Sequence, residues 1–444
     1  MRLAKHSILL LALLWLVPQA NADVTVLLEE PYSYDGALAG TGHSAIYLTR
    51  VCAASPTLLR RCEPGESGVV LSRYHRLSEY DWIAIPLLPY LYAVDKPEDI
   101  PLFADAKIVA SLRDNYRRKH LESIAPDESS GATPGGNWYE LVGSAYDRTS
   151  YGYQIETSRD QDDAFIAAYN SRANRVAYKF LTSNCADFVR EAVNFYYPKA
   201  VGRSWIADFG VATPKHAAKS LVKYSKRHPE LYFSSFIIPQ VPGTMKRSTP
   251  IHGGVDSVFK AKKYELPLLV FQPFVAGGFA VAYVAGGRFN PAKGAIVYDA
   301  SGNLEQPLTA EQRRSYEKGL EELLREKPGI APEARASWKQ FASAAQLSDD
   351  TSAGPVLLAD FGDKTVQVGI ARGNVLNNPA PAELLRDLLV ARLQEELRGK
   401  SSAKVSDAQV RADWNLLQAV LAARSQDLQV PIEAASRVRS SGTP

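Results

Sequence analysis

The sequence predicts an α+β protein of two domains, and three observations support that prediction. Apolar and polar side chains alternate over residues 43–50, which is typical of a strand. Apolar residues recur at helical spacing after Ser158 and again from Cys185. The chain has 444 residues, which is long for one domain and leaves ample residues for a buried core.

Residues 1–22 have the features of a secretory signal peptide. Arg2 and Lys5 precede the apolar run ILLLALLWLV, and the small residues of ANA precede Asp23. The apolar run is too short to cross a bilayer comfortably, so we expect cleavage near Ala22, with an uncleaved anchor as the alternative. The predicted location is therefore periplasmic or secreted.

The net charge gives no indication of a nucleic-acid partner. The formal charge of +3 falls to +1 when Arg2 and Lys5 are removed, because no acidic residue leaves with them. Nucleic-acid binding usually depends on an excess of basic residues, which the remaining chain lacks. The sequence has no HExxH motif and no cysteine pair at metal-ligand spacing, so no metal or other cofactor is expected.

Three cysteines occur in a chain predicted to enter an oxidising compartment. Cys52 and Cys62 flank a short segment whose proline and small residues suit a loop closed by a disulfide. Cys185 is left over. An odd cysteine in an exported protein forms an intermolecular bridge, is buried and inert, or is reactive.

The surroundings of Cys185 predict a helix N-terminus. Residues 175–182 alternate and predict a strand, and Pro198 ends the helical pattern that starts at Cys185. We expect Thr182 or Ser183 as the N-cap. Free amides and the helix dipole at such a position lower the pKa of a thiol, but a cysteine on the apolar face of a helix is also commonly a small buried side chain.

His43 is the histidine best placed to act as a base for the thiol. It opens the strand pattern and follows Gly40 and Gly42, which allow a turn and the close approach of another group. A core histidine with satisfied hydrogen bonds is the alternative. The other histidines beyond the signal segment lie among charged or turn-forming residues and are expected at the surface: His75, His120, His216, His228 and His252.

The strand GHSAIYL, followed much later by NC at the start of an amphipathic helix, resembles the circularly permuted papain-like hydrolases of the NlpC-related, lecithin:retinol-acyltransferase-like group. The resemblance covers roughly residues 24–235, and the segment 137–189 is especially similar to uncharacterised exported bacterial members. It implies an antiparallel sheet packed on helices, with Cys185 as nucleophile and His43 as base. The amide of Cys185 and a neighbouring donor would then form an oxyanion hole.

In this group a polar residue on a later strand orients the imidazole. The run GVVLSRYHRL offers Ser72, Tyr74 and His75 and does not decide among them. Asn184 either helps to shape the oxyanion hole or caps the helix. The third catalytic residue therefore stays open.

The resemblance implies cleavage of an amide or ester bond in a cell-envelope substrate, either a peptidoglycan peptide or a lipid acyl group, through a cysteine thioester. One alternative is a noncatalytic envelope-binding or assembly module with the same fold. Another is a membrane-tethered folding factor, which depends on residues 266–287. These 22 residues carry no charge and suit either buried strands, which we expect, or a membrane span.

Aromatic residues between His43 and Cys185 are expected mainly in the core, with the lining of an apolar cleft as the alternative: Tyr80, Trp82, Tyr90, Tyr92, Trp138, Tyr139, Tyr146, Tyr151 and Tyr153. Capping patterns predict helices after Ser158, Thr309 and Ser406, and a further helix follows Pro381. Residues 354–373 predict a hairpin turning at Gly362 and Asp363, and residues 127–137 predict a loop. The expected units are the papain-like domain at 23–240, a linker at 241–264, a smaller α+β accessory domain at 265–435 and a disordered tail at 436–444.

Overall fold

The computed structural model describes residues 22–32, 40–254 and 289–299, apart from a few single positions, and shorter stretches among residues 304–326, 346–369 and 410–417. Residues 1–21 of the predicted signal segment, the tail, the helix after Pro381 and nearly all of residues 266–287 lie outside the described residues. Within the part of the chain that is described, no helix combines the length and apolar character needed to cross a membrane.

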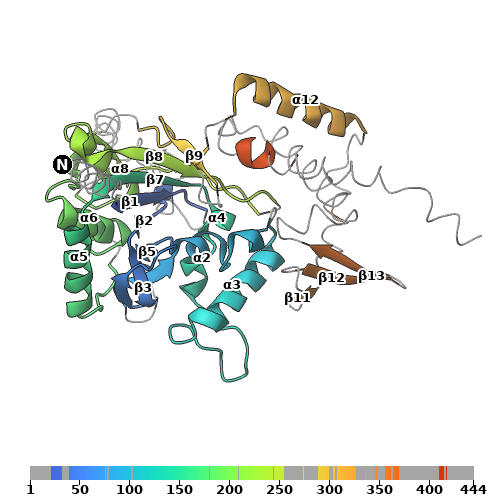
Figure 1. Cartoon of the computed structure of the whole chain (residues 1–444), viewed down its shortest axis with the longest axis horizontal. Coiled ribbons are helices and arrows are strands. Elements are labelled where there is room, and N and C mark those ends of the chain that lie inside the picture. The colour runs from blue at the N-terminus through green and yellow to red at the C-terminus, as the bar shows by residue number, and fades with distance from the viewer. Residues whose placement is uncertain are drawn as a thin grey trace, which may run out of the picture.

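An eight-stranded sheet forms the centre of the fold (Figure 1), in the order β10-β9-β8-β7-β1-β2-β5-β6. Neighbouring strands are antiparallel except for β8 and β9, which are parallel. This arrangement confirms the α+β class with a mostly antiparallel sheet, whereas the papain-like permutation stays a prediction. The strands are β1 (Ala22–Glu29), β2 (His43–Leu48), β5 (Val69–Ser72), β6 (Ile83–Pro86), β7 (Ser150–Thr157), β8 (Ser234–Ile238), β9 (Ile296–Tyr298) and β10 (Leu304–Glu305).

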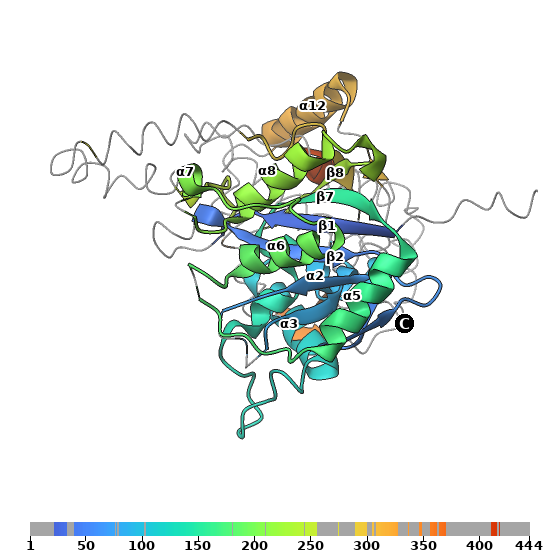
Figure 2. The ribbon, with the colours of Figure 1, turned by 90° about the vertical axis from the view of Figure 1, so that its left-hand side faces the viewer.

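Helices cover both faces of the sheet (Figures 1 and 2). Along β1, Val26 and Leu28 pack in one apolar cluster with Phe188 of α6, whereas Leu27 packs in a second cluster with Ile108 of α3. Successive side chains of a strand point to opposite faces, so this alternation buries β1 on both sides. The first face carries α5 (Arg159–Ser171), α6 (Cys185–Tyr196) and α8 (Pro214–Ser225), and the second carries α2 (Leu87–Tyr92), α3 (Ala106–His120) and α4 (Ser144–Asp147).

Strand β1 lies between β7 and β2 in the sheet. Its residues pair with β2 on one side, where Glu29 lies opposite His43, and with β7 on the other, where Glu29 lies opposite Ser150. The last residue of β1 therefore lies in the same row of the sheet as the first residues of β2 and β7.

Two local sequence signals are confirmed. Ser158 and Gln161 form a capping box at the start of α5, and Cys52 and Cys62 are joined by a disulfide. The disulfide closes the hairpin of β3 (Val51–Ser55) and β4 (Leu58–Arg61).

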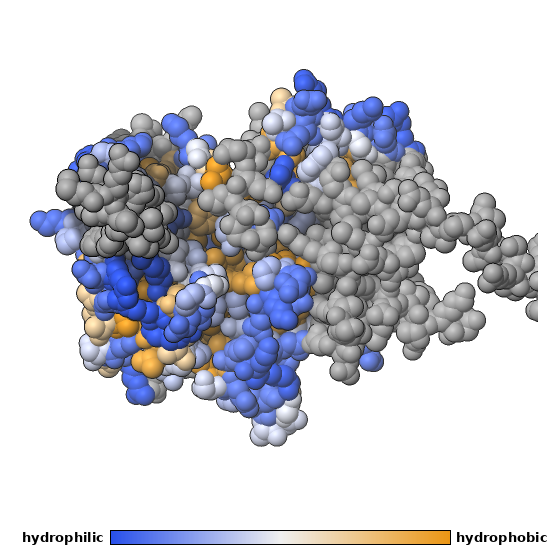
Figure 3. Space-filling view, viewed as in Figure 1, coloured by the Kyte–Doolittle hydropathy of each residue, from blue (hydrophilic) through white to orange (hydrophobic). Residues whose placement is uncertain are grey.

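Helix α3 ends in four basic residues, Arg117 to His120, and its surroundings form a largely hydrophilic face in Figure 3.

The distal part contains the predicted helix and hairpin. Thr309 and Gln312 exchange hydrogen bonds at the start of α12 (Ala310–Glu326). Strand β12 (Val356–Phe361) pairs with β13 (Lys364–Gly369), and β11 (Gln346–Ser348) joins them. Residues 410–414 are helical, while the predicted cap at Ser406 lies outside the described residues. Strands β9 and β10 belong to the main sheet, which therefore continues past the predicted linker.

The predicted strand over residues 175–182 does not form. Val176, on the predicted apolar face, is 43% exposed, so the alternation does not bury that face. Instead, Lys179 and Ser183 exchange backbone hydrogen bonds of 3.1 and 2.8 Å in a local turn. An alternating sequence forms a strand only if a partner strand is available to pair with it. Here the backbone N–H and C=O groups of Lys179 and Ser183 bond to each other instead.

Candidate active site

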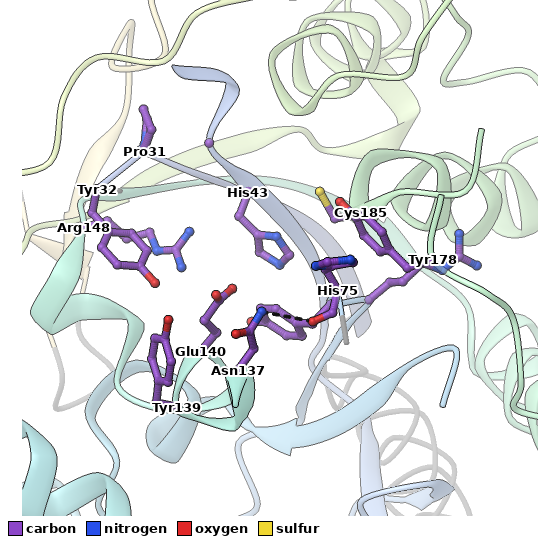
Figure 4. A pocket seen from close by; sticks show the side chains of 13 residues that line it. Pro31, Tyr32, His43, His75, Asn137, Tyr139, Glu140, Arg148, Tyr178 and Cys185 are labelled. Carbon is purple, nitrogen blue, oxygen red and sulfur yellow. Dashed lines mark hydrogen bonds between the residues drawn. The ribbon is translucent and has the colours of Figure 1, made fainter. Parts of the chain in front are cut away.

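A cavity of about 610 Å³ opens at the start of β2 (Figure 4). It receives side chains from the segment after β1, from β2, from the segment after β5, from residues 137–140, from the residue after α4, and from the loop before α6 and α6 itself. The predicted nucleophile, Cys185, and the predicted base, His43, both line it. The lining residues are Pro31, Tyr32, Gly42, His43, Arg73, Tyr74, His75, Asn137, Tyr139, Glu140, Arg148, Tyr178 and Cys185.

His43 is held by two of the residues that the sequence left as alternatives. Its Nε2 lies 2.6 Å from Oγ of Ser72, the last residue of β5. The ring of Tyr74 stacks on the imidazole with 4.5 Å between centroids and an angle of 16° between planes. Nδ1 makes no hydrogen bond within the described part of the chain. When Nε2 carries the ring proton and donates it to Ser72, Nδ1 has the free lone pair and can accept a proton from a thiol.

Gly42 brings the chain close to β1 before His43. Its φ is +69°, and an added Cβ would lie 2.1 Å from the carbonyl oxygen of Glu29. A side chain at this position would displace the start of β2 from β1. The close approach therefore depends on glycine, as the sequence predicted.

Cys185 is the first residue of α6, but the N-cap is Asn184, not Thr182 or Ser183. Oδ1 of Asn184 accepts a hydrogen bond from the Asp187 amide at 3.0 Å, and the Asp187 carboxylate accepts from the Asn184 amide at 3.3 Å. This capping box fixes the helix start at Cys185. Because Nδ2 of Asn184 also donates to the carbonyl of Ala212 at 3.0 Å, the observed role of Asn184 is capping, and its geometry gives no support to an oxyanion role.

Arg73 connects the histidine side of the cavity to the cysteine side. It follows Ser72 and donates from Nη1 to the carbonyl of Asn184 at 3.3 Å and to the Ser183 hydroxyl at 3.2 Å. Nε donates to the buried carboxylate of Asp81 at 2.5 Å. Arg73 thus fixes the start of α6 against the end of β5, and with it Cys185 relative to the serine that holds His43.

The thiol of Cys185 is buried, and the residue is 7% exposed. Burial raises the pKa of the thiol, while the neighbouring Ser44 and the backbone of Ala186 act to lower it. The raised pKa corrects the expectation of a lowered one. The helix N-terminus is present, but the loss of solvation outweighs its amides.

Burial also keeps the pKa of His43 well below its ordinary value, and the positive charge of Arg148 lowers it further. No hydrogen bond joins Sγ of Cys185 to the imidazole among the described residues. Both groups are therefore neutral near pH 7, so the resting site holds a thiol and an imidazole in one cavity instead of a preformed ion pair. Catalytic hydrogen bonds are commonly long before substrate binds.

A series of buried side-chain contacts leads from the ring that stacks on the imidazole to Arg148. The hydroxyl of Tyr74 donates to that of Tyr90 at 3.4 Å, and the Tyr90 hydroxyl donates to Oε1 of Glu29 at 2.8 Å. Oε2 of Glu29 lies 3.3 Å from Nη1 of Arg148. Burial raises the pKa of Glu29, and the charge of Arg148 lowers it. The chain positions Tyr74, which in turn fixes the plane of the imidazole.

Three further sequence predictions concern His75, the set of aromatic residues and the loop at 127–137. His75 lines the cavity, but its ring faces Tyr178, with 5.3 Å between centroids, and the structure gives it no contact with His43. Among the predicted aromatic set, Tyr139 lines the cavity. Most of the others are buried in the core: Trp82, Tyr90, Tyr92, Trp138, Tyr146, Tyr151 and Tyr153. The predicted loop at 127–137 ends at Asn137, whose side chain donates to the carbonyl of His75 at 3.2 Å.

Sequence reasoning missed Arg73, Arg148, Glu29 and Tyr178. The pair of acids that ends the apolar run VTVLLEE was a usable signal, because an acid at the end of a buried strand needs a partner. Arg148, a basic residue directly before an apolar strand, was another. The other two have no comparable signal in the sequence.

One group of potential metal ligands occurs within the described stretches, formed by Cys52, Cys62 and Glu66. The two sulfurs are bonded to each other, and Glu66 forms a salt bridge with Arg60 at 2.6 Å. These atoms are engaged and do not form a metal site.

No protein-family model, curated protein or solved structure matches this chain.

Proposed function

We propose that the protein is an exported thiol hydrolase that cleaves an amide or ester bond in a cell-envelope substrate, a peptidoglycan peptide or a lipid acyl group. One observation carries the proposal: Cys185, at the N-terminus of α6, and His43, held by Ser72, line the same cavity. A helix-start cysteine beside an oriented histidine is an arrangement suited to nucleophilic acyl transfer.

The first half-reaction forms a thioester. Nδ1 of His43 accepts the proton of the Cys185 thiol as the sulfur attacks the carbonyl carbon of the substrate, and the carbonyl oxygen becomes an oxyanion. The imidazolium then gives its proton to the leaving amine or alcohol as the bond to carbon breaks. Ser72 on Nε2 keeps the ring in the required orientation. A neutral thiol and a neutral imidazole are the protonation states that this proton transfer starts from.

The start of α6 offers one backbone donor to the oxyanion. The Asp187 amide is used by Asn184, and the Ala186 amide bonds to the sulfur. The Cys185 amide, the first of the helix, has no intrahelical acceptor. It is therefore the donor that the cap leaves for the oxyanion.

The second half-reaction consumes water. His43 accepts a proton from the attacking water, the acyl carbon gains the hydroxyl oxygen, and the carbon–sulfur bond breaks. The sulfur recovers the proton from His43. The products are a carboxylic acid and the original thiol, so no redox partner is needed.

The test is detection of an acyl adduct on Cys185. The purified protein is incubated with peptidoglycan fragments, diacyl phospholipid vesicles and a diacylated lipopeptide, and intact mass and product release are measured. We expect turnover of one substrate class, its loss in Cys185→Ala and His43→Ala, and accumulation of the adduct when the second step is slowed by low temperature. A Cys52→Ala/Cys62→Ala variant, which keeps Cys185, is the matched cysteine control. Turnover that persists in Cys185→Ala contradicts the proposal.

A noncatalytic envelope-binding module is the second candidate, because burial raises the thiol pKa and no hydrogen bond joins the thiol to His43 among the described residues. It predicts binding to an envelope fraction without product release. Equal binding by the wild type and Cys185→Ala, with no adduct on any substrate, would favour this candidate.

A further inference from the structure

Arg148 is a buried cation that faces the candidate active site. It follows α4 and precedes β7, and its side chain is 4% exposed. It nevertheless lines the same cavity as Cys185 and His43. Figure 4 shows its guanidinium beside Tyr32, with His43 between this group and Cys185. A buried guanidinium is costly unless its donors are used.

Those donors are largely unused. A guanidinium has five N–H groups, and the polar contact of Arg148 in the described residues is the ion pair between Nη1 and Oε2 of Glu29 at 3.3 Å. This contact does not meet hydrogen-bond geometry, because Oε2 of Glu29 is buried without a hydrogen-bond partner, and Nε of Arg148 is buried without one as well. Glu29 therefore offsets the charge of Arg148 but leaves its planar fork available.

The orientation of the guanidinium is fixed in advance. It lies over the ring of Tyr32, 4.5 Å from the ring centroid. On the opposite side of the ion pair, Glu29 is held by the Tyr90 hydroxyl at 2.8 Å. A stacked, buried arginine loses little further conformational freedom when it binds a planar anion.

We propose that Arg148 forms a subsite for a carboxylate of the substrate, with Tyr32 as its supporting platform. This inference rests on the proposed function and names the substrate class: an acyl compound that carries a free carboxylate within reach of the scissile bond. The cavity of about 610 Å³ has room for both groups in one small molecule.

The surroundings favour a carboxylate over a phosphate. The guanidinium fork matches both anions. Glu140 also lines the cavity, and a second negative charge on the ligand would increase repulsion from this side chain. A singly charged, planar group uses the fork at lower electrostatic cost. A neutral amide has one acceptor oxygen and cannot engage the fork through two.

The experiment measures protection of Cys185 from alkylation. Full-length protein is treated with iodoacetamide in the presence of N-acetylglycine or its neutral counterpart N-acetylglycinamide, with glycerol 3-phosphate as a third arm. Because Cys52 and Cys62 are bonded to each other, the label reports Cys185. We expect the half-protecting concentration of N-acetylglycine to be about tenfold lower than that of the amide, as for a charge-assisted bidentate pair.

Variants test whether Arg148 causes the preference for the carboxylate. In Arg148→Gln the preference for the carboxylate should vanish, while Arg60→Gln, which changes an exposed arginine outside the cavity, should retain it. Since Arg148→Gln leaves Glu29 buried without its ion pair, the double variant Glu29→Gln/Arg148→Gln removes both charges and should also show no preference. Circular dichroism checks that each variant is folded.

The outcomes separate the subsite from the hydrolase. Equal protection by N-acetylglycine and its amide in the wild type overturns the subsite, as does a preference that survives in Arg148→Gln or in the double variant Glu29→Gln/Arg148→Gln. Protection by glycerol 3-phosphate alone overturns the carboxylate assignment. Carboxylate-dependent protection without turnover of any envelope substrate supports the subsite and counts against the proposed function.

Discussion

Oγ of Ser72 lies 2.6 Å from Nε2 of His43. The serine is the last residue of β5, whose neighbouring positions Val70 and Leu71 pair with β2. The hydrogen bond therefore connects two adjacent strands at the point where the cavity opens. With the ring proton on Nε2, this hydrogen bond leaves the lone pair of Nδ1 free, and Nδ1 is the atom that the proposed mechanism uses as the base.

Ser72→Ala should lower kcat about tenfold to a hundredfold and leave KM within about twofold, because the variant removes an orienting hydrogen bond and no substrate contact. Steady-state kinetics on the substrate identified by adduct formation measures both constants. Ser150→Ala is the matched control, since that buried strand serine has a hydroxyl without a hydrogen-bond partner in the described residues. Equal losses in the two variants would contradict an orienting role for Ser72.

The pH dependence of alkylation should report the raised pKa of Cys185. The thiol stays protonated to higher pH than a free thiol, so the rate of reaction with iodoacetamide should reach half its maximum above the ordinary value of about 8.5. Ser44→Ala should move this midpoint further upward, because it removes a neighbouring hydroxyl that acts to lower the pKa of the thiol. The same protein in denaturant provides the unperturbed reference. A native midpoint below that of the denatured chain would contradict the prediction.

Asp23 should make the protein less stable as the pH rises toward neutrality. Burial raises its pKa from 3.8 to about 6, while a hydrogen bond with Gln154 opposes the shift. The folded state thus holds this proton more tightly than the unfolded state, and the resulting stability is complete below pH 3.8 and lost as the pH passes about 6.

Asp23→Asn removes this dependence. Relative to the wild type, the free energy of unfolding of the variant should increase by about 1 kcal/mol between pH 4 and pH 7.5, a value reduced for partial exposure of the side chain. Urea unfolding at the two pH values measures the difference. An unchanged difference between variant and wild type at both values would show that Asp23 is ionised equally in the two states.

Removal of the disulfide should cost stability without affecting the chemistry. The Cys52–Cys62 bond closes a loop with a sequence separation of 10, which corresponds to about 2–3 kcal/mol of loop entropy in the unfolded chain. Cys52→Ala/Cys62→Ala should lower the free energy of unfolding by this amount and leave the alkylation midpoint of Cys185 in place. Loss of Cys185 reactivity in a folded double variant would show that the hairpin supports the cavity.

Local signals were sufficient for the elements that carry the candidate catalytic pair. The alternation after His43 predicted β2, and the helical spacing from Cys185 predicted α6. Both patterns depend on residues close together in sequence. Residues 175–182 show the limit of the same reasoning, because an alternating segment becomes a strand only where another strand is available to pair with it.

Contacts between distant residues could not be predicted in the same way. Ser72 was one of three polar residues in a short run, and its selection depends on the pairing of β5 with β2. The Glu29–Arg148 ion pair forms because β1 and β7 are neighbours in the sheet. The pKa of Cys185 depends on how completely the surrounding protein excludes water, which the sequence of a helix start does not reveal.

The position of β1 determines when the fold can be completed. As the chain leaves the ribosome, the strand meets β2 at once but must wait roughly 120 residues for β7, its neighbour on the other side. Closing a loop of that length costs about 4 kcal/mol of entropy before the second ladder forms. The row that contains Glu29, His43 and Ser150 is therefore complete only after β7 is available, and the cavity is complete only when Cys185 of α6 has joined it.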